Sequence, residues 1–124
     1  YHSLQDLGQA AVARHLTRNT TMTFTALEQE NGLAGMSRAL AFNIVLPDFS
    51  NQGLLFLGGR LCMLGKCRTA YLFYEKNKKL CSLFIMDDRH VSFEMADGCR
   101  FSNQIQGLHT NIWKENGQVY ALVF

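Results

Sequence analysis

The sequence has little charge of either sign. Only 18% of its 124 residues are Asp, Glu, Lys or Arg while 48% are apolar, so a folded core is expected and disorder is not. The net charge of +2 is too small to favour nucleic acid or an anionic membrane surface as a partner. No apolar run approaches the roughly 20 residues that cross a bilayer. The length predicts one domain, residues 1–124.

Known catalytic and metal-binding motifs are also missing. The chain has no G-x-S-x-G elbow, no H-E-x-x-H sequence and no Walker sequence. The histidines are scattered along the chain, at His2, His15, His90 and His109. Because no nucleophile is paired with a base, we expect neither an enzyme nor a cofactor. The four cysteines include no C-x-x-C pair, so the usual structural zinc pattern is missing and no metal site is expected.

What the sequence does contain is a run of strand signals between residues 47 and 86. Three apolar segments are separated by two turn signals, Gly65-Lys66 and the charged stretch 75–79. Glycine at the first central position suits a type II′ turn, and the second connection has the length of an ordinary hairpin loop. The segments 54–64, 68–74 and 80–86 are therefore predicted to form an antiparallel meander.

The segments on either side supply further elements. Apolar residues recur at helical spacing over residues 3–17, which predicts an amphipathic helix with Ser3 as its N-cap. Residues 20–25 alternate weakly, residues 26–30 and 36–41 predict short helical pieces, and residues 42–46 predict a short strand that Pro47 ends. Residues 91–95 fit a strand or a short helix, and the polar residues 100–107 predict no element.

Asn116-Gly117 is the strongest hairpin signal in the chain, and it joins segments 108–113 and 119–124. The predicted fold class is therefore α+β. We expect an N-terminal helix packed on a mainly antiparallel sheet of about five or six strands, formed by the meander and the C-terminal hairpin.

Alternation about the Gly65-Lys66 turn assigns the meander residues to two faces. One face is predicted to be buried and to carry Leu57, Leu61, Ala70 and Leu72. The opposite face is predicted to carry Cys62, Leu64, Cys67 and Thr69.

Gly58-Gly59-Arg60 interrupts the first predicted strand. It is not a phosphate-binding loop because a strand, and not a helix, follows it. The two glycines indicate a β-bulge or a close backbone approach. We expect Arg60 to be structural or to face a partner, either paired with a carboxylate such as Asp48 or Asp97 or solvated.

Several short motifs, in their order and spacing, carry a resemblance. They are His15-Leu16-Thr17, Leu46-Pro47-Asp48-Phe49, Gly53, Leu57-Gly58-Gly59-Arg60-Leu61, Leu64, Ala70-x-Leu72-x-Tyr74, Ser82-Leu83-Phe84-Ile85, Gly107-Leu108, Trp113 and Gly117-x-x-Tyr120-Ala121-Leu122-Val123. Together they resemble the extracytoplasmic domain of membrane-anchored anti-sigma factors, the predicted transmembrane transcriptional regulators of bacteria. The chain differs from that family in its Gly65-Lys66 turn, where Asp-Gly is usual, and in its cysteines.

The resemblance implies a non-catalytic sensory domain on the periplasmic side of the inner membrane. A cytoplasmic segment outside this chain would hold the sigma factor, and a transmembrane helix would provide the anchor. The first residue is Tyr1 and the last is Phe124, in an apolar run, so both ends look like cuts in a longer protein. A homodimer is possible, and no nucleic acid is expected as a direct partner.

The cysteines, Cys62, Cys67, Cys81 and Cys99, allow two interpretations. They are either structural thiols or the active part of a redox or metal-sensing domain on another membrane-anchored protein. An extracytoplasmic location favours at least one disulfide. The preferred pairs are Cys62–Cys67, across the first hairpin, and Cys81–Cys99. A loop as short as that of Cys62–Cys67 gives only about 2 kcal/mol of stabilisation, so such a bond is expected to be readily reduced.

Overall fold

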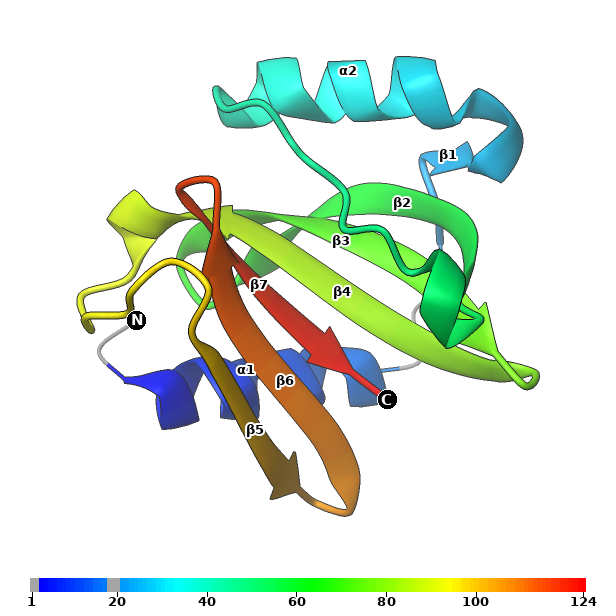
Figure 1. Ribbon diagram of the computed structural model, residues 1–124. Helices are drawn as coiled ribbons and strands as arrows, with labels where there is room; N and C mark the ends of the chain where they lie inside the picture. The colour runs from blue at the N-terminus through cyan, green and yellow to red at the C-terminus, as the bar shows by residue number, and fades with distance from the viewer. Residues whose placement is uncertain (1–2, 18–20) are drawn as a thin grey trace.

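The computed structural model describes residues 3–17 and 21–124, and in it one antiparallel sheet is covered by a helix on each face (Figure 1). The sheet has seven strands in the order β1-β2-β3-β4-β7-β6-β5. The helices and strands are α1 (Leu4–Leu16), β1 (Phe24–Thr25), α2 (Gln29–Leu40), β2 (Leu55–Leu64), β3 (Cys67–Lys76), β4 (Lys79–Asp87), β5 (Arg100–Ile105), β6 (Leu108–Glu115) and β7 (Gln118–Val123). Three short 3-10 helices join them: η1 (Ala26–Glu28), η2 (Ser50–Gln52) and η3 (Asp88–His90). The α+β class is confirmed, with more strands than expected.

Helix α1 forms where the apolar periodicity predicts it. The Ser3 side chain caps its first turn, and Ser3 Oγ accepts a hydrogen bond from the Asp6 backbone N–H at 3.0 Å. Leu7, Ala11 and Val12 are fully buried on the side that faces the sheet. The amphipathic stripe therefore sets which face of α1 meets the sheet.

The meander is present, with the predicted first turn and a second turn that is tighter than expected. Gly65 has φ of +63° while Lys66 is outside the positive region, the pattern of a type II′ turn. The second connection is not a loop of residues 75–79. Asn77 and Lys78, with φ of 53° and 66°, form a two-residue turn, and the strands extend to the pair Lys76–Lys79. Asparagine tolerates the left-handed conformation, which lets a charged sequence make a tight turn.

The second half of the sheet contains a strand that the sequence pattern did not predict. β5 pairs with β6 through a two-residue turn at Gln106-Gly107, whose φ values are 52° and 80°. Most of β5 is solvent-exposed, so it lacks the apolar alternation of a half-buried strand. The predicted hairpin at Asn116-Gly117 is confirmed, with φ of 57° and 71°.

Three expectations for the connecting segments are corrected. The short pieces expected over 26–30 and 36–41 are η1 and one helix of 12 residues, α2. Residues 42–46 are not a strand, because their polar backbone groups bond to side chains of β7 rather than to a neighbouring strand: the Val45 N–H donates to Gln118 Oε1 at 3.3 Å, and the Val45 carbonyl accepts from the Tyr120 hydroxyl at 2.7 Å. Residues 91–95 are neither strand nor helix.

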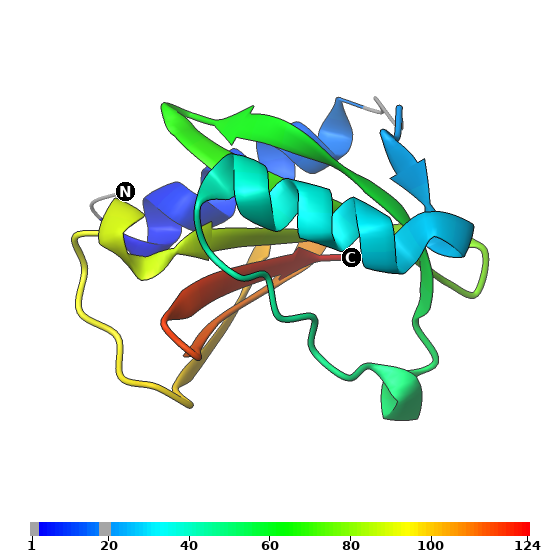
Figure 2. The ribbon, with the colours of Figure 1, turned by 90° about the horizontal axis from the view of Figure 1, so that it is seen from above.

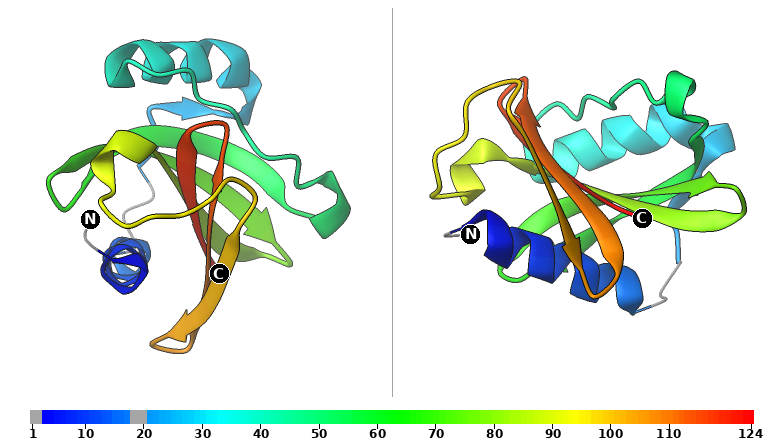
Figure 3. Two further views of the ribbon diagram at one scale, coloured as in Figure 1. Left: turned by 60° about the vertical axis from the view of Figure 1, so that its left-hand side comes forward. Right: turned by 60° about the horizontal axis from the view of Figure 1, so that its bottom comes forward.

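The two faces of the sheet have separate apolar cores, and Figure 3 shows α1 and α2 on opposite sides of the strands. The core under α1 includes Leu64, Tyr71, Phe73, Phe84, Met86, Ile112, Val119 and Val123. The core on the other face includes Leu72, Tyr74, Leu83, Ile85, Trp113, Tyr120 and Leu122. Segment 41–49 leaves the end of α2 and runs to η2 on that same side (Figure 2).

A register shift in β2 changes one predicted face. Leu61, Ala70 and Leu72 share the α2 face as expected, although Leu61 is only half-buried. Leu57 packs instead with the α1 core, because the pairing of β2 with β3 shifts between Phe56 and Gly58. One extra residue in a strand reverses the side-chain alternation beyond it.

Candidate functional site

The Gly58-Gly59 pair lies within β2 where β1 pairs with it, antiparallel, with Phe24 opposite Gly59 and Thr25 opposite Gly58. The register shift agrees with the expected bulge, and Gly58 has φ of +157°. A Cβ atom on Gly58 would lie 2.3 Å from the Phe24 carbonyl oxygen, and one on Gly59 would lie 2.7 Å from Leu72 Cδ2. Both glycines therefore permit close packing of β1 and Phe24 on β2, which is a structural role.

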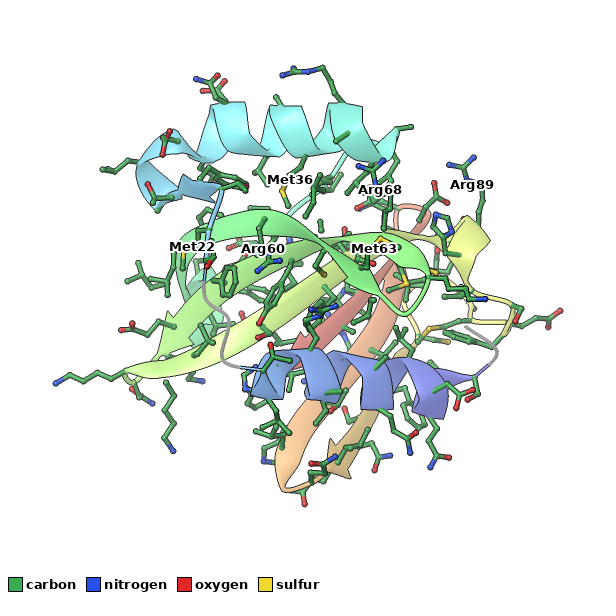
Figure 4. The ribbon with its side chains drawn as sticks, turned by 180° about the vertical axis from the view of Figure 1, so that it is seen from behind. Met22, Met36, Arg60, Met63, Arg68 and Arg89 are labelled. Atoms are coloured by element: carbon green, nitrogen blue, oxygen red, sulfur yellow. The ribbon has the colours of Figure 1, made fainter. Side chains whose placement is uncertain are left out.

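Arg60 lies on β2 between α2 and α1 (Figure 4). Its Nε donates to the Leu61 carbonyl at 3.3 Å. Within residues 3–17 and 21–124, the ion pairs are Arg89–Asp87 at 2.9 Å and Lys114–Asp88 at 3.4 Å, so the expected pairing of Arg60 with Asp48 or Asp97 is not found there. Arg60 bonds instead to the backbone of its own strand.

The four cysteines do not gather in one place. Cys62 belongs to the core under α1 and Cys81 to the core on the opposite face. Cys67 is half-buried at the start of β3, and Cys99 is exposed in the connection before β5. In the described part of the chain, no three His, Cys, Asp or Glu side chains gather to hold a metal ion.

The cysteine thiols are free, and the predicted disulfides remain predictions for the oxidised protein. The register places Cys62 opposite Thr69 and Leu64 opposite Cys67, as expected, so Cys62 and Cys67 are diagonal neighbours. Burial raises the pKa of the Cys62 and Cys81 thiols, with partial opposition at Cys62 from Arg14 and Arg60. A raised pKa lowers the thiolate fraction and so the reactivity of both side chains.

A hydrogen-bonded chain that the sequence did not reveal links α1 to the middle of the sheet. His15 Nδ1 lies 2.6 Å from Ser82 Oγ, and Ser82 Oγ lies 2.7 Å from the Tyr71 hydroxyl. Burial lowers the pKa of His15 and raises that of Tyr71. The available signal was weak: His15 continues the buried helical stripe of Leu7 and Ala11, and Ser82 is the polar residue of an apolar strand.

This chain has the atoms of a serine–histidine pair without the access that catalysis needs. Ser82 is fully buried, and its hydroxyl bonds to both His15 and Tyr71. A substrate would have to displace part of the core to reach Ser82 Oγ. The geometry therefore favours a structural link, through which a change at His15 reaches the sheet.

His15 lines a cavity of about 760 Å³ at the end of α1. The cavity lies beside the β3–β4 turn, the start of β6 and the end of β7. Its walls are formed by His15, Leu16, Lys76, Asn77, Lys79, Leu80, Cys81, Gly107, Leu108, His109 and Phe124. We call this cavity the α1 cleft.

The α1 cleft lies at the end of the sheet where β3 turns into β4 and β5 turns into β6. Val123 of β7 pairs with Ser82 on one side and with Thr110 on the other. Beyond that pair, the His109 N–H donates to the Phe124 carbonyl at 2.8 Å and the Phe124 N–H donates to the His109 carbonyl at 3.0 Å, so Phe124 continues the pairing with β6. Figure 1 shows the two hairpins diverging at this end of the sheet.

The α1 cleft combines an apolar surface with positive charge. Leu80, Leu108 and Phe124 supply apolar surface, and the His109 ring stacks on Phe124 with centroids 5.2 Å apart. Lys76 and Lys79 add two positive charges, and no Asp or Glu of the described chain is among the lining residues. Such a cavity suits an anion with an apolar body.

Comparison of the chain with protein families, with curated proteins and with solved structures gives no match. Among the described residues, no helix is long and apolar enough to cross a membrane.

Proposed function

We propose that residues 1–124 form the non-catalytic sensory domain of a membrane-anchored anti-sigma factor, on the periplasmic side of the bacterial inner membrane. A segment outside these residues holds the sigma factor, and ligand binding by the domain regulates its release. The α1 cleft, apolar and lined by cationic side chains, is the observation that carries the proposal.

The residues behind the family resemblance support a binding scaffold rather than a catalytic centre. Ser82 to Ile85 are all buried on β4, an inner strand of the sheet. Trp113 stacks on Tyr120 with centroids 5.1 Å apart and planes 7° apart. The motif residues therefore specify the sheet and its packing.

The cleft has a physical connection to the first helix of the domain. A bound anion next to His15 favours the protonated imidazole, which opposes the burial that lowers the His15 pKa. His15 in turn touches Ser82 in the core, at 2.6 Å. A ligand can thus change how α1 is held on the sheet. In the anti-sigma factors that the chain resembles, the transmembrane anchor precedes the domain, so α1 would be the element nearest to it.

The test is a reporter gene driven by a sigma-dependent promoter, in cells that make the full-length protein containing these residues. A sigma factor should co-purify with the full-length protein, and removal of residues 1–124 should change reporter output. Lys76→Gln with Lys79→Gln should alter the response, while the control Lys66→Gln with Arg68→Gln, on the other hairpin, should not. A full-length protein that binds no sigma factor would contradict the proposal.

A further inference from the structure

The two outer edges of the sheet differ in how many of their backbone hydrogen-bonding groups have partners. The outer edge of β2 beyond β1 has its carbonyl groups occupied. The Gly59 carbonyl accepts from the Thr23 N–H at 2.8 Å, the Leu61 carbonyl from Arg60 Nε at 3.3 Å, and the Met63 carbonyl from the Arg14 guanidinium. An edge whose acceptors are already bonded is a poor template for another strand.

The outer edge of β5 is less protected, with one outward group occupied, the Gln104 N–H. Ile105 and Leu108 flank a two-residue turn and form a hydrogen-bonded pair, and such pairs alternate along an antiparallel ladder. Ser102 therefore directs its backbone N–H and C=O away from β6, as do Arg100 and Gln104. Within the described chain, the Gln104 N–H donates to Asn103 Oδ1 at 2.8 Å, and no further strand pairs with this edge.

The side chains of β5 also lack the usual edge defences. The strand reads Arg-Phe-Ser-Asn-Gln-Ile, with no proline, no glycine and one charge, at its first residue. Phe101 is 38% exposed. The ladder with β6 runs without a register shift over the whole strand. A regular, exposed and nearly uncharged edge favours the addition of another strand.

We propose that this edge pairs with the β5 of a second copy of the chain, antiparallel and about a two-fold axis at Ser102. Along β5, every second residue directs its backbone N–H and C=O away from β6. A symmetric pairing of two copies must therefore place these residues opposite each other. Centred on Ser102, the register sets Arg100 opposite Gln104 of the second copy and Phe101 opposite Asn103.

A second copy is the occupant that the charges favour. In this register the one charge of each strand faces a neutral amide, so two identical strands meet without like charges opposite each other. A two-fold interface also uses the same six residues on both sides, which makes it self-complementary. The interface is small, so the dimer should form only at high protein concentration. This inference does not depend on the proposed function.

Analytical ultracentrifugation of residues 1–124 over a range of concentrations tests the proposal. The wild type should show a reversible shift from monomer to dimer mass. Ser102→Lys places two like charges on the two-fold axis, and Gln104→Lys places a lysine opposite Arg100, so each should keep the protein monomeric. Met63→Lys adds the same charge to the β2 edge and should leave the dimer intact.

Thermal unfolding checks that each variant is folded. If Ser102→Lys does not fold, the mass of Gln104→Lys provides the test. A wild type that stays monomeric at every concentration would overturn the proposal. So would a dimer that survives both β5 substitutions, or one that Met63→Lys alone abolishes.

Discussion

The two faces of the sheet are anchored by different kinds of polar contact. On the α2 face, Gln118 and Tyr120 bond to the backbone of the irregular segment at Asn43 and Val45. Burial raises the pKa of Tyr120 to about 12, so this anchor keeps one protonation state at physiological pH. The face with α1 is instead anchored through a histidine.

That difference determines which face can respond to its surroundings. His15 has a pKa that burial lowers from 6.5, and its side chain lines the α1 cleft and bonds to Ser82. Tyr120 does none of these. If the domain is a sensor as proposed, we therefore expect the α1 face to be its responsive side and the α2 face its fixed side.

A matched pair of leucines tests whether both faces are true cores. Leu7 on α1 and Leu72 on the α2 face are each 0% exposed. Leu7→Ala and Leu72→Ala should each lower the free energy of unfolding by about 2 to 5 kcal/mol, measured in urea. Leu61→Ala should cost less, because Leu61 is half-buried. A Leu7→Ala variant as stable as wild type would show that α1 is not part of the core.

The bulge gives the next largest expected effect. Gly58→Ala would place a Cβ 2.3 Å from the Phe24 carbonyl, so we expect a loss of about 1 to 3 kcal/mol. Gly35→Ala is the matched control, because Gly35 is in α2 and its Cβ would meet only Arg38, at 3.9 Å. That variant should be about 0.5 to 1 kcal/mol more stable than wild type. Equal effects would contradict the assignment of Gly58 to a close contact.

One hydroxyl on each face can be removed to compare the anchors. Ser82→Ala leaves the buried Tyr71 hydroxyl and His15 without their partner, and Tyr120→Phe leaves the Val45 carbonyl without its donor. Each should cost about 1 to 3 kcal/mol in chemical unfolding. Only Ser82→Ala should also shift the pKa of His15, followed by NMR titration. An equal shift of the His15 pKa in Tyr120→Phe would contradict the specific link between His15 and Ser82.

The pH dependence of stability isolates the histidine. Burial lowers the pKa of His15 below the value of 6.5 for the unfolded chain, so the unfolded state binds more protons. Its contribution is present above pH 6.5 and is lost as the pH falls through the lower, folded pKa. His15→Gln should flatten the loss of stability between about pH 7 and pH 5. An unchanged profile would contradict the burial of this imidazole.

Much of this fold was predictable because local chemistry and tertiary structure agree. Ser3, Gly65 and Asn116-Gly117 each set a cap or a turn that the structure contains. β5 was missed because its side chains face solvent, and Leu57 was assigned to the wrong face because a bulge adds a residue that no periodicity reveals.

The candidate site was predictable only in its parts. The cysteines were singled out as a group, yet alternation along two strands sends Cys62 and Cys81 to opposite faces. His15 and Ser82 are 67 positions apart, and their contact depends on how α1 docks on the sheet. Such contacts follow from topology, which local patterns do not specify.

Binding of decanoate to residues 1–124, followed by amide NMR shifts below the micelle concentration, tests the central claim most directly. We expect saturable shifts at Leu80, Leu108 and His109, with tighter binding at pH 6 than at pH 8 and weaker binding of neutral decanol. Lys76→Gln with Lys79→Gln should weaken binding about fivefold, for two exposed ion pairs of roughly 0.5 kcal/mol each, and Lys66→Gln with Arg68→Gln should not. Shifts scattered over the surface, or equal binding by both double variants, would contradict the account.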